Sequence, residues 1–209
     1  MSILSYFAQG AALGFTAGVS PGPLQTYLIS QALVGGWRQA APVVFAPLIT
    51  DIPIILVSLF ILDHLPPYVL HVVSLAGGVF VIYLAWAVWK TWRSGEIMDG
   101  NEEYSASKNL SRGVLTNFLN PSPYLFWGLV NGPLLLSALN KSILAGVSFL
   151  LGFYGILITT MLVLAGLFGQ AKRLGANTVR VLLLVSAIIL VIFGGILIYR
   201  GIMGILTLF

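Results

Sequence analysis

The sequence predicts an all-α membrane protein with six transmembrane helices, and three observations support this fold class. Hydrophobic residues make up 58% of the chain and charged residues only 8%, whereas soluble domains carry about 25% charged residues. Six apolar segments are long enough to cross a hydrocarbon core of about 30 Å. The tetrapeptide Ser20-Pro21-Gly22-Pro23 also has a counterpart, Asn120-Pro121-Ser122-Pro123, and both lie within long apolar segments.

The six predicted spans cover residues 3–34, 40–62, 68–89, 110–136, 142–167 and 179–206. They divide one membrane domain into a first three-helix repeat at 1–92, a cytoplasmic linker at 93–109 and a second three-helix repeat at 110–209. Because each repeat has an odd number of helices, equivalent helices cross in opposite directions, which defines an inverted-topology repeat. The similar patterns Gly78…Ile82-Tyr83 and Gly194…Ile198-Tyr199 in the third and sixth spans favour this division.

Basic residues predict the orientation of the chain, because cytoplasmic connections carry an excess of Lys and Arg. The connections after the first, third and fifth spans hold eight of them, and the opposite side holds Lys141 and Arg200. We therefore expect these three connections in the cytoplasm and both termini outside it. The eight residues are Arg38, Lys90, Arg93, Lys108, Arg112, Lys172, Arg173 and Arg180.

Composition also excludes several functions. The net charge of +4 is spread over short connections, so we expect no nucleic-acid partner. The chain has no cysteine, hence no disulfide, thiolate metal site or cysteine nucleophile. The N-terminus lacks a basic region before its apolar stretch and is interpreted as the first membrane helix, not as a signal peptide.

Enzyme and metal sites are considered and not favoured. Residues 18–22 match the G-x-S-x-G pattern, but that pattern needs a strand–turn–helix context, which apolar helices do not supply. Asp63, His64 and His71 could bind a metal ion, although histidines near a membrane surface usually do not. We predict no enzymatic activity, no catalytic residue, no cofactor and no metal site.

The paired proline motifs predict helices that stop and restart inside the membrane. Ser20 and Asn120 are favourable N-cap residues, and Pro21 and Pro121 then occupy the first helical position, where a missing N–H group costs nothing. A helix N-terminus carries partial positive charge and free donors, and therefore binds anions such as carboxylates. Two interrupted helices at corresponding places in two repeats indicate a transporter binding site.

Asp51 is the one carboxylate predicted at the middle of a span. Holding a charge at the bilayer centre costs about 2.5–3.5 kcal/mol on insertion scales, so such residues usually mark an ion or substrate pathway. Asp51 is a candidate proton carrier or partner for a substrate ammonium group. The structural alternative is that it caps one of the broken helix ends.

Other polar and small residues allow more than one interpretation. Gly10, Gly14, Gly18 and Gly22 share one helix face, which indicates close helix packing or a smooth wall along a substrate path. Asn117 and Asn120 share a face and are candidate cavity residues. Other polar residues of the broken spans could line the cavity or bond to neighbouring helices, and three tyrosines could gate or anchor. These residues are Gln25, Thr26, Ser30, Gln31, Thr116, Tyr124 and Asn131, with Tyr83, Tyr154 and Tyr199.

Residues 90–112 form the only long predicted connection and hold eight of the sixteen charged residues, including Glu96, Asp99, Glu102 and Glu103. We expect a solvated, partly disordered linker. A regulatory or partner-binding loop is the alternative.

With these residues identified, the chain resembles the lysine exporter (LysE/RhtB-type) family of bacterial amino-acid exporters over nearly its whole length. The matching features are Gly14…Ser20-Pro21-Gly22-Pro23, Asp51, Gly78…Tyr83-Leu84 and Asn120-Pro121…Tyr124-Leu125-Phe126-Trp127. The departures from the usual family pattern are Pro123 and Tyr124. The resemblance implies efflux of an amino acid or similar small metabolite across the bacterial inner membrane, driven by an ion gradient.

We therefore expect a proton-coupled exporter whose substrate-binding residues are Ser20, Pro21, Gly22, Pro23, Asn117, Asn120 and Pro121. The substrate carboxylate would dock on the two half-helix N-termini, and the two halves would rock about this site. The alternatives are an exporter of a divalent cation or other inorganic ion, and a non-transporting membrane scaffold. The expected partners are a small-molecule substrate, the lipid bilayer and a coupling proton, while the glycine faces also allow a homo-oligomer.

Overall fold

The computed structural model describes residues 2–60, 68–94, 105–171 and 175–207, and the regular structure within them is helical. The all-α prediction is therefore confirmed for the described residues. In chain order the helices, of which η2 is a π-helix, are α1 (Ile3–Val19), α2 (Pro23–Gly35), α3 (Trp37–Val44), α4 (Ala46–Phe60), α5 (Tyr68–Ser94), α6 (Ala106–Phe118), α7 (Pro121–Phe126), η2 (Trp127–Asn131), α8 (Gly132–Lys141), α9 (Ile143–Gly169) and α10 (Ala176–Leu206).

Four helical stretches among the described residues are long and apolar enough to cross a membrane. They are Trp37–Ser58, His71–Arg93, Ile143–Gly169 and Asn177–Leu206, and they correspond to the second, third, fifth and sixth predicted spans. The first and fourth predicted spans are divided into shorter helices, because each is interrupted at its proline motif. Interruption of these two helices at the proline motifs confirms that part of the prediction.

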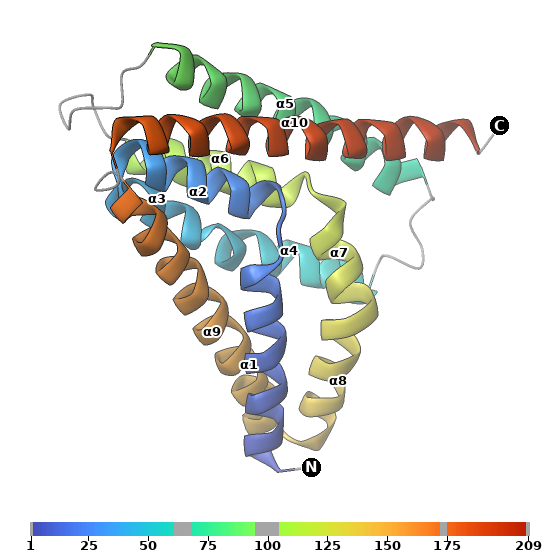
Figure 1. Cartoon of the computed structure of the whole chain (residues 1–209). Coiled ribbons are helices and arrows are strands. Elements are labelled where there is room, and N and C mark those ends of the chain that lie inside the picture. Colours follow the sequence, from blue (N-terminus) through green and yellow to red (C-terminus); the bar gives the residue numbers. More distant parts are fainter. Residues whose placement is uncertain (1, 61–67, 95–104, 172–174, 208–209) are drawn as a thin grey trace.

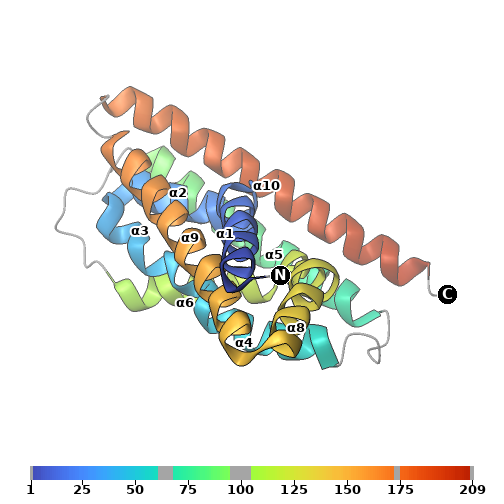
Figure 2. The same ribbon diagram turned by 90° about the horizontal axis from the view of Figure 1, so that it is seen from below.

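The helices run in different directions instead of forming a bundle of parallel rods (Figure 1). The helices α2, α5, α6 and α10 form one layer in this view, whereas α1, α8 and α9 extend away from it. The view from below shows α1 almost end-on, with α10 along one edge of the molecule (Figure 2). Both proline breaks, between α1 and α2 and between α6 and α7, lie where the chain passes from one of these groups to the other.

The long helices α5 and α10 pack against each other through two glycines in a reciprocal manner. A Cβ atom on Gly78 would lie 2.8 Å from the carbonyl oxygen of Gly194 and 2.7 Å from the side chain of Ile198. A Cβ atom on Gly194 would lie 3.0 Å from the carbonyl oxygen of Gly78 and 2.8 Å from the side chain of Ile82. The two glycine–isoleucine patterns noticed in the sequence therefore lie face to face.

The helices α1 and α9 pack even more closely. A Cβ atom on Gly10 would overlap the carbonyl oxygen of Phe149, and one on Gly14 would overlap that of Phe153. From the opposite side, Gly152 faces the carbonyl oxygen of Phe7. Helix association in a membrane depends on such van der Waals contact, because lipid supplies no hydrophobic driving force between helices. The predicted packing seam is confirmed for Gly10, Gly14 and Gly18, which meets Thr160 of α9. Gly22 is not part of it, because it is the N-cap of α2 and lines the cavity.

The long predicted connection at 90–112 is shorter than expected, because helices enter it from both sides. Helix α5 continues to Ser94, and α6 begins at Ala106. Ser105 starts α6 as an N-cap, since its hydroxyl accepts a hydrogen bond from the Lys108 N–H group at 3.2 Å. Several residues considered in the sequence analysis lie outside the described residues. They are the acidic residues of the predicted linker, Glu96, Asp99, Glu102 and Glu103, together with Asp63, His64, Lys172 and Arg173.

Candidate functional site

The first helix break lies between Val19 and Pro23. The Ser20 backbone N–H group still bonds to the Thr16 carbonyl at 3.0 Å, and its hydroxyl donates to the same oxygen at 2.6 Å. Ser20 therefore ends α1, and Gly22 is the N-cap of α2 with Pro23 as its first residue. The prediction that Ser20 caps a helix starting at Pro21 was wrong, because the hydroxyl of Ser20 is already engaged by the preceding helix.

No side chain caps the N-terminus of α2. Gly22 has extended backbone angles and offers no capping group, so the first N–H groups of α2 receive no bond from an N-cap side chain. Gln25 folds back over the break, and its Nε2 atom donates to the Ala17 carbonyl at 2.8 Å. The glutamine thus ties the two helix ends together.

The second helix break, between Phe118 and Pro121, is built as the sequence predicts. Asn120 is the N-cap of α7, and its Oδ1 atom accepts a hydrogen bond from the Ser122 N–H group at 3.1 Å. Pro121 occupies the first helical position. The Tyr124 hydroxyl also donates across the break to the Phe118 carbonyl at 2.9 Å. From Pro121 the helical backbone continues through η2 into α8.

Asp51 lies on α4 and is only 4% exposed. Its Oδ2 atom accepts hydrogen bonds from Trp127 Nε1 at 3.2 Å and from the Tyr154 hydroxyl at 3.0 Å. Both donors are neutral, and they come from η2 and α9. Next to Asp51, the Asn117 Nδ2 atom donates to the Thr50 hydroxyl at 2.6 Å, which links α6 to α4. Asp51 is thus bonded to η2 and α9, and does not cap either helix break through these contacts.

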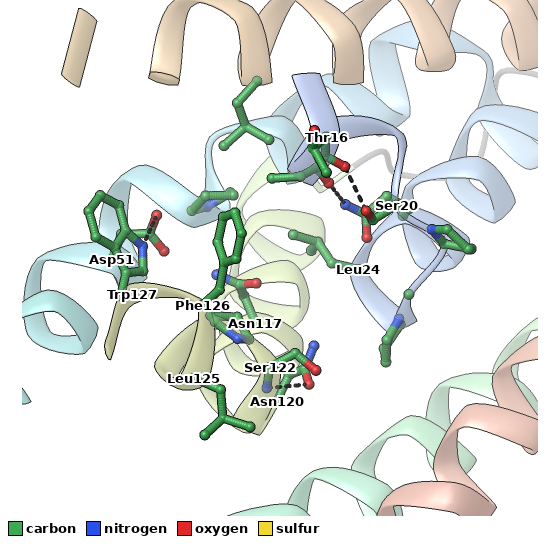
Figure 3. Close-up of a pocket in the computed structure, with 18 of the residues that line it drawn as sticks. Thr16, Ser20, Leu24, Asp51, Asn117, Asn120, Ser122, Leu125, Phe126 and Trp127 are labelled. Carbon is green, nitrogen blue, oxygen red and sulfur yellow. Dashed lines mark hydrogen bonds between the residues drawn. The ribbon is translucent and has the colours of Figure 1, made fainter. Parts of the chain in front are cut away.

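A cavity of about 610 Å³ lies between the two helix breaks (Figure 3). The close-up shows Asp51 and Trp127 on one side, Ser20 on another, and Asn117, Asn120 and Ser122 on the segment around the second break. Of the eight predicted site residues, seven line this cavity and Pro121 does not. The seven are Ser20, Pro21, Gly22, Pro23, Asp51, Asn117 and Asn120.

The remaining polar residues of the broken spans mostly bond within the protein. The hydroxyls of Thr26, Ser30 and Thr116 donate to carbonyls of their own helices. Gln31 accepts a hydrogen bond from Gln39. Among the polar residues of the broken spans that were named as possible cavity residues in addition to Asn117 and Asn120, only Gln25 lines the cavity.

The three candidate tyrosines occupy different surroundings. Tyr154 is bonded to Asp51, and Tyr83 accepts a hydrogen bond from Arg112 at 3.3 Å. Tyr199 is 65% exposed. None of the three lines the cavity, but Tyr154 donates a hydrogen bond to Asp51, which does line it.

Sequence reasoning missed three features of the site. Trp127 was noticed only as part of a motif, although it is buried and bonds to Asp51. Arg200 is the one Lys or Arg among the described residues that line the cavity. The apolar walls were also missed. A buried tryptophan usually bonds through its N–H group, so the pairing of Trp127 with the lone buried acid was the one signal that could have been used.

The segment behind Trp127 is unusual in two ways. Trp127–Asn131 form a π-helix, a geometry that occurs frequently at functional sites. Asn131 at its end is fully buried, and neither its Oδ1 nor its Nδ2 atom has a hydrogen-bond partner. Asn131 does not line the cavity. A buried amide without partners costs free energy, so Asn131 is held at this position by packing and not by side-chain hydrogen bonds.

The exposed surface of the molecule indicates that lipid surrounds it. Large apolar side chains are exposed along several helices, including Phe15 on α1, Ile52 on α4, Leu151 on α9 and Val181 on α10. Hydrocarbon accommodates such a surface, while soluble monomers rarely expose large contiguous apolar patches. Apolar helices, two helix breaks and a cavity holding a buried carboxylate together define a multi-pass membrane protein with the features of a transporter.

The family is shown by a direct comparison. The model of the LysE type translocator family matches residues 15–201 of the chain. The chain therefore belongs to this family, as its resemblance to lysine exporters indicated, and is a membrane transporter. The comparison with curated proteins and the comparison with solved structures each returned no match.

Proposed function

We propose that this protein is a secondary active transporter that exports an amino acid or a similar small metabolite across the bacterial inner membrane, coupled to protons. The observation that carries the proposal is the position of Asp51, which lines a cavity between two helix breaks. Asp51 is the only acidic residue in the described part of the chain. The hydrogen bonds that it accepts from Trp127 and Tyr154 come from neutral donors, so a substrate ammonium group or a proton can neutralise it.

The helix N-termini at the breaks supply the complementary site for a carboxylate. The α2 terminus at Pro23 has no capping side chain, and Asn120 and Ser122 border the same cavity. Partial positive charge and free N–H donors at a helix start attract an anion. In this proposal the carboxylate of the substrate binds near Gly22 and Asn120, and its ammonium group faces Asp51.

The inverted repeat remains part of the proposal and is supported by the α5–α10 contact. In an inverted repeat a pseudo-two-fold axis relates the third span to the sixth, so a contact between these two spans at the axis is reciprocal. The reciprocal contacts of Gly78 with Ile198 and of Gly194 with Ile82 have this form. They favour three-helix repeats at 1–92 and 110–209, joined through 93–109.

Alternating access would then arise from movement at the two breaks. The first break joins α1 to α2, and the second joins α6, which lies in the same layer as α2, to α7, which leads into α8 (Figure 1). Because α1 and α9 are in backbone contact at Gly10 and Gly14, they would move together although they belong to different repeats. The moving groups in this proposal therefore combine helices from both repeats.

Exchange of Asp51→Asn tests the coupling role. We expect purified wild-type protein in proteoliposomes to move one amino acid of a radiolabelled panel in a manner that depends on a pH gradient. The variant should lose the gradient dependence while remaining folded, because an asparagine oxygen can still accept the bonds from Trp127 and Tyr154. Counterflow with and without the gradient measures both effects.

Ser58→Ala is the matched control, since Ser58 is also buried on α4 but does not line the cavity. It should leave gradient-driven transport in place. Undiminished coupled transport by Asp51→Asn would remove Asp51 from the mechanism. A well-folded wild-type protein that moves no amino acid would contradict the proposed substrate class.

The orientation can be tested directly because the chain has no cysteine. Single cysteines at Ser2 and at Thr207, near the two ends, should react with a membrane-impermeant maleimide added outside intact cells. A cysteine at Ser105, at the start of α6, should react only after the cells are opened. The opposite labelling pattern would reverse the predicted topology.

The alternatives receive less support from the described residues. A divalent-cation exporter needs several convergent oxygen or imidazole ligands, and no group of three His, Cys, Asp or Glu residues occurs in the described part of the chain. A membrane scaffold gives no reason for a 610 Å³ cavity between two broken helices.

A further inference from the structure

The cavity has extensive apolar walls that the carboxylate and ammonium sites do not use. Phe126 lies on α7, Leu157 on α9, and Phe193, Ile196 and Leu197 lie on one face of α10. In the close-up the Phe126 side chain lies between the Asp51–Trp127 pair and the first break (Figure 3). Three helices thus line the cavity with aromatic and aliphatic side chains.

Most polar side chains that border the cavity are already bonded to the protein. The hydroxyls of Thr16 and Ser20 donate to carbonyls of α1. The amide groups of Gln25 and Asn117 donate to Ala17 and to Thr50. A substrate with a hydroxyl or charged side chain would therefore lose hydration and find few partners among these four residues, which disfavours its binding. Arg200 and Ser122 also line the cavity, and among the described residues Arg200 is the one cationic partner that an acidic side chain would find there.

We propose that the substrate is an amino acid with a large apolar side chain, of the leucine or phenylalanine class, held with this side chain against Phe126 and the α10 face. This inference rests on the proposed function and narrows its substrate. A cavity of 610 Å³ falls within the range of about 300–1,000 Å³ found for small-molecule sites. It leaves room for a bulky side chain beyond the α-amino and α-carboxyl groups.

A transport panel tests the inference. Proteoliposomes with wild-type protein are given equal concentrations of labelled leucine, phenylalanine, threonine, serine, lysine and glutamate. We expect the transport efficiency for leucine or phenylalanine to exceed that for the four polar amino acids at least about tenfold. Equal or better transport of a polar amino acid would overturn this inference and leave the proposed function intact. Transport of none of them would overturn both.

Substitutions of Phe126 provide a second test that locates the apolar subsite. Phe126→Ser should lower the ratio of leucine to threonine transport efficiency about fivefold or more, while Phe126→Leu should keep the wild-type ratio. Phe15→Ser is the control, because Phe15 is 55% exposed on α1 and does not line the cavity. Thermal melting verifies that each variant is folded. An unchanged ratio in folded Phe126→Ser would overturn the placement of the substrate side chain.

Discussion

The two helix breaks have similar sequences but differ in how the protein satisfies them. At the second break Asn120 caps α7, and Tyr124 bonds across the gap to Phe118. At the first break Ser20 bonds backward to α1, and Gly22 at the start of α2 has no capping side chain. The second break is thus closed by its own residues, whereas the first keeps N–H donors that no N-cap side chain uses. Because of this difference, we expect the first break to offer more N–H donors to a substrate carboxylate than the second break does.

The largest expected effect comes from giving the first break a cap of its own. Gly22→Asp places a carboxylate at the N-cap of α2. This carboxylate would accept hydrogen bonds from the first backbone N–H groups of α2 and would repel a substrate carboxylate. We expect transport efficiency to fall about tenfold or more, because like charges in contact cost several kcal/mol. Thermal stability should stay equal or rise slightly, since Asp is a better N-cap than Gly by a few tenths of a kcal/mol.

The control is Gly22→Asn, which caps the helix without adding charge. It should reduce transport less than Gly22→Asp does. Both variants place a Cβ atom 3.3 Å from the Gln25 side chain, so the difference between them isolates the charge. Equal transport by wild type and Gly22→Asp would show that no substrate carboxylate binds at this break.

A smaller effect, mainly on stability, is expected at the second break. Asn120→Ala removes the cap of α7 and should lower the free energy of unfolding by about 1 kcal/mol. For a chain of this size the melting temperature should drop by about 2–4 °C. Thermal denaturation in detergent measures the change, and Asn120→Ser, which can also cap, should restore most of it. A melting temperature unchanged by Asn120→Ala would mean that the cap contributes nothing.

The smallest effect is expected for Ser20→Ala. The Ser20 hydroxyl bonds to a carbonyl that already receives the backbone N–H group of the same residue, so its removal leaves no unpaired group. We expect a change of no more than about 0.5 kcal/mol in stability, as for most substitutions without a special structural role. Parallel melting of Ser20→Ala and Asn120→Ala checks the asymmetry. A larger loss in Ser20→Ala would reverse the comparison between the breaks.

Local patterns predicted the second break correctly and the first only in part. Asn120 and Pro121 act as the N-cap and first helical residue, as capping preferences indicate. In Ser20-Pro21-Gly22-Pro23 either proline can begin a helix, and the choice depends on whether the Ser20 hydroxyl faces backward or forward. Sequence preference does not distinguish these cases, because both give Ser20 a hydrogen bond.

The contacts of Asp51 could not be predicted from local patterns. Its partners Trp127 and Tyr154 are 76 and 103 residues away in the chain, and their approach depends on how α4, η2 and α9 pack. The membrane cost of a charge predicted that Asp51 would face a cavity or a partner. The structure supplies both, but nothing in the sequence spacing identified the tryptophan and the tyrosine.

The glycine contact between α1 and α9 has a consequence for the synthesis of the protein. Gly14 on α1 packs against Phe153, which the ribosome adds 139 residues later. At about 5–20 residues per second, this delay is roughly 7–30 s. During that time the glycine face of α1 lacks its final partner and can contact only lipid, the insertion machinery or other parts of the nascent chain. Helix α1 is thus made well before the partner that completes its native packing.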